Sequence, residues 1–287
     1  MEATRVFEAQ NVLGEGPVWN EEERALYWVD IAGKTINRFW PESREAEAFP
    51  LDVQVGVLAF RESGGMIVAG RTGFSFWSPK EKELKPICDP ESDNEASRFN
   101  DGKVDRKGRF WAGTMTNEGA VSSLYRMDAD LSVHRMVTNV TISNGIGWSP
   151  DNRTMYYVDS LRYVIYAYDF NLASGQIMDR RDLLRVDAAY GIPDGLTVDR
   201  EGNIWCAFYG GAKVSRITRQ GEIDREVVLP VAQPTSCAFG GEDYGDLYVT
   251  SAWQGLTGGE RNKQPWAGDL FVIRTDSQGL PEPRFAG

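Results

Sequence analysis

Short apolar runs alternate with polar turns along the whole chain. The runs are rich in Val, Ile, Tyr, Trp and Phe, and the turns between them are rich in Gly, Asp, Asn and Ser. This alternation is typical of β-strands joined by hairpins, and long helical patterns are missing. The pattern therefore predicts an all-β protein.

The strand pattern repeats six times. In each repeat an apolar strand, a polar turn and a second strand rich in Trp, Tyr or Val are followed by a third strand, for example TINRFW, GFSFWS or KVSRIT. The first strands end at Trp19, Phe60, Val104, Trp148, Val198 and Phe239. The residues four positions earlier are Glu15, Gly56, Asn100, Asn144, Asp194 and Thr235, and their spacings are 41, 44, 44, 50 and 41 positions.

Such spacings are typical of propeller blades with four strands each. We therefore predict a six-bladed β-propeller, with four-stranded antiparallel blades around a central channel. Residues 1–287 would form this single domain, and residues 4–9 would supply a strand that closes the ring against the last blade.

The column of residues four positions before the strand ends carries the candidate chemistry. The first strand of each blade lines the channel, so equivalent positions point to one place on its axis. The column supplies two carboxylates and two amides there, Glu15, Asn100, Asn144 and Asp194. Taken singly, residues in GEGP, SNG and PDG could be plain turn residues. Their common register favours a site instead.

A divalent cation would compensate the charges of this column. Two carboxylates that face each other across a narrow channel repel each other unless a cation or a proton lies between them. Oxygen ligands favour hard cations such as Ca²⁺, Mg²⁺ or Mn²⁺. Three or four protein ligands leave positions open for water and substrate, as in a catalytic metal site.

Two more residues are placed near the channel mouth. Arg98 lies two positions before Asn100, so both face the same side of an extended strand. Arg98 would hold a carbonyl or hydroxyl oxygen, or form a surface salt bridge. Glu118 follows the strand FWAGTM and would overhang the mouth, or be a solvated loop acid.

Composition and charge narrow the function further. The net charge of −11 argues against binding to nucleic acid or anionic membranes. No run approaches the roughly 18 apolar residues of a membrane span. The single histidine, His134, excludes histidine-based triads and multi-histidine metal sites. Three cysteines and a charged amino-terminal segment without a signal core favour a cytoplasmic location. No pattern indicates an oligomeric state.

The ordered set of motifs identifies a family resemblance. The strings LGEGPVW, RFNDGKVDRKGRFWAGTM, SNGIGWSPD, YYVDSL, IPDGLTVDREGNIW and TSCAFGG span nearly the whole chain. Together they resemble the gluconolactonase family that includes regucalcin, the senescence marker protein. The resemblance implies a six-bladed propeller that binds one divalent cation and hydrolyses sugar lactones, such as gluconolactone, to aldonic acids. Ca²⁺ is the first expectation, with Zn²⁺, Mg²⁺ or Mn²⁺ as alternatives.

The resemblance also implies roles for individual residues. By the matching motifs, the metal ligands correspond to Glu15, Asn144 and Asp194. The residues that contact substrate correspond to Arg98, Asn100 and Glu118, and Asp194 would also be the general base. The stretch after GTM, TNEGAVSSLYRM, is shorter than in the animal members, which leaves the role of Glu118 and the size of the substrate open.

Alternative functions share the same site. Because a carboxylate bound to a dication is a weak base, a hydroxide held by the cation is an alternative nucleophile. A phosphotriesterase or fluorophosphatase would use the same channel, and a calcium-binding protein without turnover would need only the cation. Gluconate, xylonate, arabinonate, galactonate and deoxy-sugar lactones all remain candidate substrates.

Overall fold

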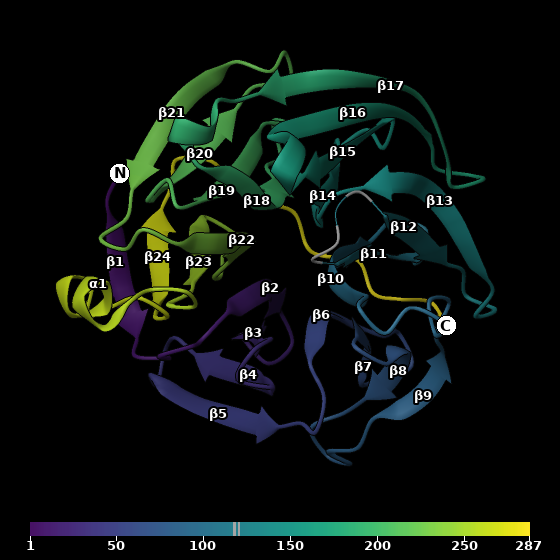
Figure 1. Cartoon of the computed structure of the whole chain (residues 1–287), viewed down its shortest axis with the longest axis horizontal. Helices are drawn as coiled ribbons and strands as arrows, with labels where there is room; N and C mark the ends of the chain where they lie inside the picture. Colours follow the sequence, from purple (N-terminus) through teal and green to yellow (C-terminus); the bar gives the residue numbers. More distant parts are fainter. Residues whose placement is uncertain (117–118, 120) are drawn as a thin grey trace.

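The computed structural model describes residues 1–116, 119 and 121–287. Within these residues the chain forms six four-stranded antiparallel sheets that surround a central channel (Figure 1). This confirms the prediction of an all-β, six-bladed β-propeller.

The first three blades follow one another along the chain, each from its innermost to its outermost strand. Blade one contains β2 (Gly14–Asn20), β3 (Ala25–Asp30), β4 (Thr35–Trp40) and β5 (Glu45–Pro50). Blade two contains β6 (Val55–Phe60), β7 (Met66–Gly70), β8 (Gly73–Trp77) and β9 (Lys85–Cys88). Blade three contains β10 (Arg98–Val104), β11 (Phe110–Met115), β12 (Ser122–Met127) and β13 (Val133–Val140).

The second half of the ring repeats this order. Blade four contains β14 (Ser143–Trp148), β15 (Thr154–Asp159), β16 (Val164–Asn171) and β17 (Gln176–Arg185). Blade five contains β18 (Ile192–Val198), β19 (Ile204–Tyr209), β20 (Lys213–Ile217) and β21 (Ile223–Val228). Blade six contains β22 (Pro234–Gly240), β23 (Asp246–Ser251), β24 (Leu270–Arg274) and β1 (Ala3–Phe7). Short helical segments connect strands at η1 (Ser160–Arg162), η2 (Ala188–Tyr190) and α1 (Gly258–Lys263).

The two ends of the chain share blade six. Strand β1 pairs antiparallel with β24 as the outermost strand of that blade, as Figure 1 shows. The guanidinium of Arg5 lies 2.7 Å from the carboxylate of Asp269, whose side chain is fully buried. Phe7 packs against Trp28 and Phe39 of blade one. The predicted closing strand is therefore confirmed, at residues 3–7 rather than 4–9.

Aromatic side chains fill the spaces between neighbouring blades. Trp111 of β11 contacts Trp148 of β14, with ring centroids 5.9 Å apart. Trp19 of β2 stacks on Tyr248 of β23 at 5.7 Å. Such pairs contribute to stability beyond the apolar area that they bury. Each blade therefore depends on its neighbours for a closed core.

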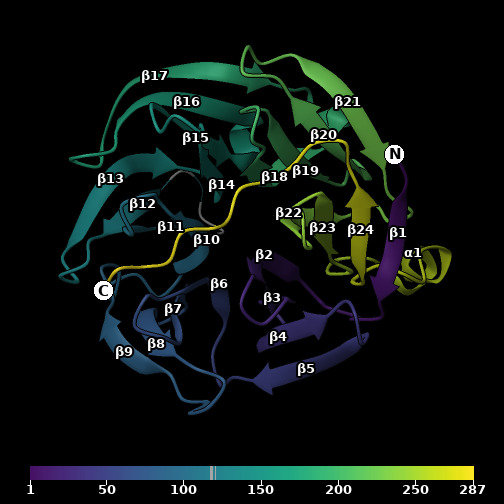
Figure 2. The same cartoon turned by 180° about the vertical axis from the view of Figure 1, so that it is seen from behind.

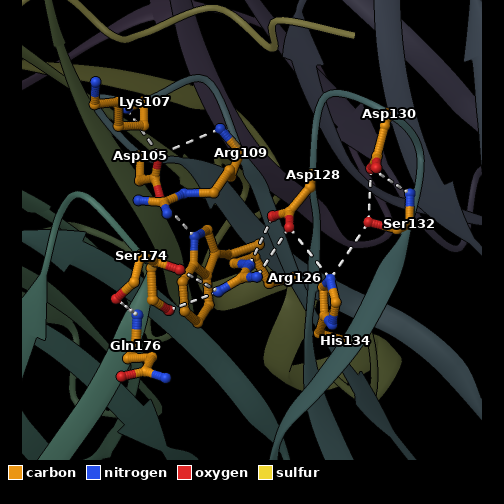
Figure 3. A network of polar contacts seen from close by, with 12 residues as sticks. Asp105, Lys107, Arg109, Arg126, Asp128, Asp130, Ser132, His134, Ser174 and Gln176 are labelled. Carbon is orange, nitrogen blue, oxygen red and sulfur yellow. Dashed lines mark hydrogen bonds and ion pairs between the residues drawn. The ribbon is translucent and has the colours of Figure 1, made fainter.

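A polar network also joins blades three and four (Figure 3). The buried carboxylate of Asp105 accepts hydrogen bonds from Arg109 Nε at 2.7 Å and Trp111 Nε1 at 2.9 Å. Arg109 in turn donates to the Leu172 carbonyl of blade four at 2.7 Å. His134, the single histidine, lies on the outer strand β13, half-exposed beside Asp128.

The carboxy-terminal segment 278–287 crosses the back of the ring, as Figure 2 shows. Its backbone is hydrogen-bonded to blades two and three, through Phe285 N to Phe60 O at 2.8 Å and Ala286 N to Gly108 O at 3.0 Å. Glu282 forms a 3.0 Å ion pair with Lys103 of β10. The segment therefore covers the back end of the central channel.

Among the described residues, no helix has the length and apolar character that would let it cross a lipid bilayer.

Candidate functional site

Each innermost strand carries a β-bulge at the predicted column. The pairing with the second strand shifts register between Glu15 and Val18, Val55 and Val57, Phe99 and Asp101, Ser143 and Ile146, Pro193 and Leu196, and Pro234 and Ser236. A bulge bends its strand and re-aims the side chains at that point. The six bulges therefore turn the column side chains toward the channel.

Two glycines show why the inner strands pack so tightly there. A Cβ atom on Gly145 would lie 2.6 Å from the carbonyl oxygen of Asp194, and one on Gly195 would lie 2.0 Å from Ser236 Oγ. Both distances are below any normal contact, so only glycine fits after Asn144 and after Asp194. The SNG and PDG motifs thus bring adjacent inner strands together at the site.

The column opens into a cavity of about 250 Å³ at the front of the channel. Its walls come from the inner strands and the loops above them, and the lining residues are Leu13, Glu15, Arg98, Asn100, Met115, Ile142, Asn144, Ser160, Leu161, Ile192, Asp194, Tyr209 and Gln254. Five of the six residues predicted from the sequence to bind metal or substrate therefore lie around one cavity. The sixth, Glu118, lies outside the described residues.

Glu15 and Asp194 are buried carboxylates, 5% and 6% exposed. Burial raises the pKa of Glu15 well above its usual range, and the charges of Asp194 and Asp101 raise it further. Burial likewise raises the pKa of Asp194, again with a contribution from Asp101. The site therefore concentrates negative charge where water screens it poorly.

Two oxygens of the site have no hydrogen-bond partner. They are Asn144 Oδ1 and Asp194 Oδ1, and both are buried. The amide nitrogen of Asn144 donates to Ser160 Oγ at 3.1 Å, which fixes the amide with its oxygen free. Buried oxygens of this kind, beside a second carboxylate, have the chemistry that a hard cation needs.

The candidate metal ligands thus combine two carboxylates with one amide. The described residues contain no cluster of three His, Cys, Asp or Glu side chains that could hold a metal. A metal centre at this position would therefore need an amide ligand, such as Asn144, beside Glu15 and Asp194. The oxygen-only donor set fits Ca²⁺, Mg²⁺ or Mn²⁺.

Arg98 and Asn100 form a connected pair on β10. Arg98 Nη1 donates to Asn100 Oδ1 at 2.8 Å, and Asn100 Nδ2 donates to the Ser143 carbonyl at 2.9 Å. Burial lowers the pKa of Arg98 to about 10, against the opposing charge of Glu15. The guanidinium is therefore charged at neutral pH and lies beside the carboxylates.

Asp101 is a third buried carboxylate that the sequence reasoning missed. It is 7% exposed, and burial raises its pKa to about 6, opposed by the Gly102 N–H and by Lys103. On a regular strand the residue after Asn100 would face away from the column. The bulge at this point brings both residues inward, and the sequence signal was only the adjacent pair in RFND.

Comparison with known proteins shows the same architecture in one family. Residues 13–253 match the family model described as SMP-30/Gluconolactonase/LRE-like region. Regucalcin of Gallus gallus is 40% identical over 284 residues, covering 96% of this chain and 95% of the relative. The protein named "Putative sugar lactone lactonase YvrE" of Bacillus subtilis is 36% identical over 291 residues, covering 100% and 99% of the two chains.

A solved structure superposes on nearly the whole chain. It is that of a calcium-binding protein, regucalcin, from Agrobacterium tumefaciens, with a TM-score of 0.95 and 26% identity. The match covers 99% of this chain and 97% of that one. The propeller and its strand order are therefore common to both.

Proposed function

The chain belongs to the SMP-30/gluconolactonase/LRE-like family, and we propose that it is a metal-dependent hydrolase that opens sugar lactones, such as gluconolactone, to aldonic acids. The family and the Bacillus subtilis relative named for lactone hydrolysis support this reaction. The observation that carries the proposal is the cavity itself. Two buried oxygens without partners lie there beside a second carboxylate and a charged arginine.

Glu15, Asn144 and Asp194 would hold one divalent cation. Ca²⁺ is the first choice because all the donors are oxygens and two relatives are named for calcium, with Zn²⁺, Mg²⁺ and Mn²⁺ as alternatives. When bound, such a cation polarises the lactone carbonyl as a Lewis acid.

Arg98 and Asn100 would position the substrate. Their side chains are hydrogen-bonded to each other and line the same cavity, so they present fixed donors to ring hydroxyls or to the carbonyl oxygen. Preorganised donors lower the barrier because no reorganisation is needed as charge develops.

Asp194 would move the proton. A water oxygen attacks the lactone carbonyl carbon, and Asp194 accepts the proton that the water releases. The bond between that carbon and the ring oxygen then breaks, and the proton passes to the departing oxygen. Asp194 would therefore both help to hold the cation and move the proton.

A panel of lactones tests the reaction. The purified protein should release acid from one or more aldonolactones, stop after chelation, and regain activity when Ca²⁺, Zn²⁺, Mg²⁺ or Mn²⁺ is added back. No metal-dependent hydrolysis of any lactone would overturn the proposal. Turnover of phosphotriesters alone would support a phosphotriesterase instead. Cation binding without any turnover would support a calcium-binding protein.

The Asp194→Asn variant tests the proton step. We expect kcat to fall by about 10² or more, with cation binding measured separately by calorimetry. Full activity with the cation retained would exclude Asp194 as the base. Glu201→Gln, at an exposed turn of the same blade, is the matched control and should leave both quantities unchanged.

A further inference from the structure

A second cavity of about 260 Å³ lies between blades four and five, which are neighbours in the ring (Figure 1). We call it the interblade cleft, and none of the described residues that line it lines the front cavity. Its charged lining residues are Asp151, Arg181, Arg200, Glu201 and Arg219. The backbone N–H of Arg200 donates to the Gln278 carbonyl at 2.8 Å, so the cleft lies beside the carboxy-terminal segment at the back of the ring.

Tyr156 of β15 presents an unused hydroxyl to this cleft. Its side chain lines the cleft, and the residue is only 3% exposed. No other described residue forms a hydrogen bond with its oxygen, and that oxygen is not one of the fully enclosed polar atoms without a partner. Buried phenols usually pair their hydroxyl with a polar group. The Tyr156 hydroxyl is therefore available to a ligand in the cleft.

Arg219, in the turn between β20 and β21, brings a guanidinium without a protein partner to the same cleft. It forms no hydrogen bond or ion pair with another described residue. A Cβ atom on Gly202, whose φ is +87°, would lie only 2.9 Å from Arg219 Cδ, so glycine leaves room there for the arginine stem. Burial raises the pKa of the Tyr156 phenol, and the positive charge of Arg219 opposes this rise. The guanidinium therefore lies near the phenol.

Two further guanidinium groups are fixed at the cleft by other contacts. Arg181 Nη1 donates to Asp169 Oδ1 at 2.7 Å. Arg200 Nε donates to the Gly279 carbonyl at 3.1 Å, and its Nη1 donates to Gln278 Oε1 at 2.9 Å. A guanidinium has five N–H donors. Each of these arginines therefore keeps donors that no described residue uses, in a position already set by its neighbours.

The charges of the lining residues leave a positive excess. Three guanidinium groups outnumber two carboxylates there, in a chain whose net charge is −11. The carboxylate of Asp151 accepts hydrogen bonds from Ser149 Oγ at 2.6 Å and Arg153 N at 3.2 Å, which tie it into its own turn. Arginines gathered around a buried hydroxyl in an acidic protein offer a local site for an anion.

We propose that the interblade cleft binds a phosphate group, as inorganic phosphate or as a small phosphomonoester. Arginine forks match phosphate oxygens in pairs, and the Tyr156 hydroxyl would donate to a further oxygen. The donors come from β15, β17 and the turns that hold Arg200 and Arg219, so they reach a ligand from several directions. A tetrahedral anion accepts from several directions, whereas a carboxylate accepts mainly in its own plane. This site does not depend on the proposed lactonase function.

Isothermal titration calorimetry at about pH 7.5 and constant ionic strength tests the class of ligand. The probes are inorganic phosphate, glycerol 3-phosphate and malonate, a dicarboxylate of similar charge. We expect one saturable site for at least one phosphate probe, with malonate at least about tenfold weaker. Binding of inorganic phosphate alone would identify free phosphate as the ligand, and stronger binding of glycerol 3-phosphate would identify a phosphomonoester. No binding of either, or equal binding of malonate, would overturn the proposal.

Variants assign the bound phosphate to the cleft. Arg219→Gln should raise the Kd of the tighter phosphate probe by about tenfold, and Tyr156→Phe, which removes only the hydroxyl, by about threefold or more. Arg180→Gln is the matched control, because Arg180 is an exposed arginine of β17 that does not line the cleft, and it should leave the Kd unchanged. Thermal unfolding would verify that all three variants fold. An unchanged Kd in either cleft variant, or an equal rise in Arg180→Gln, would overturn the proposal.

Discussion

Asn144 and Asp194 each keep one buried oxygen without a hydrogen-bond partner. Buried polar atoms in folded proteins are nearly always paired, and an unpaired one costs about 1–3 kcal/mol. The chain tolerates two of them around one cavity, near the negative charges of Glu15 and Asp101. Such an arrangement costs stability, and a cation bound by these oxygens, as proposed, would offset that cost.

The raised pKa values of Glu15 and Asp194 predict how cation binding depends on pH. Above the ordinary carboxyl pKa, the folded metal-free protein binds more protons than the unfolded chain, so its stability falls as pH rises through the raised pKa values. A cation must displace these protons. We therefore expect the Ca²⁺-induced rise in Tm to grow from pH 5 to pH 8.

Calorimetry in buffers of different ionisation enthalpy would count the protons released on Ca²⁺ binding. An affinity that does not change with pH, together with no proton release, would show that the two carboxylates do not titrate with the cation.

The Glu15→Gln variant separates the effect of this residue on the stability of the metal-free protein from its effect on Ca²⁺ binding. The substitution keeps the size of the side chain and removes a carboxyl group whose ionisation Asp194 and Asp101 oppose. We expect the metal-free variant to be as stable as the native protein or more stable at pH 7, and its Ca²⁺-induced Tm shift to disappear. A retained shift would exclude Glu15 as a ligand, and Glu201→Gln again serves as the control.

At the scale of elements, the turn between the first two strands is anchored by a buried aspartate in two blades. Asp105 accepts from Trp111 Nε1 at 2.9 Å in blade three, and Asp199 accepts from Trp205 Nε1 at 3.2 Å in blade five. Both aspartates are fully buried. The repeated strings DRKGRFW and DREGNIW thus encode one hairpin design, which holds the second strand in the core.

Replacement of Asp105 by alanine should destabilise blades three and four together. Arg109, 9% exposed at its side chain, would lose its ion pair, and Trp111 would lose its acceptor. Breaking a buried ion pair from one side costs about 3–5 kcal/mol. Urea unfolding would measure this loss. Asp130→Ala, at an exposed turn of blade three, should change stability by less than about 0.5 kcal/mol, and a similar loss in both variants would contradict the assignment.

The strands and the column could be predicted from the sequence because both depend on local periodicity. The third strand of blade one is observed at Thr35–Trp40, as the string TINRFW predicted. The side-chain direction at Asp101 could not be predicted, because nothing in the string RFND signals the bulge between Phe99 and Asp101. Phe99 and Asn100 place their carbonyl oxygens so close to Gly56 that any side chain there would clash. Likewise, no local sequence pattern predicts the isolated antiparallel bridge between Met115 and Ile142.

At the scale of the whole molecule, the ring is closed by the pairing of β1 with β24. Deletion of residues 1–8 removes this strand, the partner of the buried Asp269 and the contact of Phe7 with blade one. We expect a loss of about 5 kcal/mol in the free energy of unfolding. Deletion of Met1 and Glu2 alone, which precede the strand and are exposed, should have little effect. Equal stability of the two deletions would show that β1 does not close the ring.

The carboxy-terminal segment that crosses the back of the propeller affects the route by which substrate and product would reach the cavity. Among the described residues, Glu282 and Pro283 of this segment help to line a space of only about 20 Å³ behind the inner strands, against about 250 Å³ in the front cavity, so the front mouth is the wider entrance. Under the proposed function, the acid anion would leave through the same mouth by which the lactone entered. Entry of the lactone and release of the acid would therefore alternate at the mouth of the cavity.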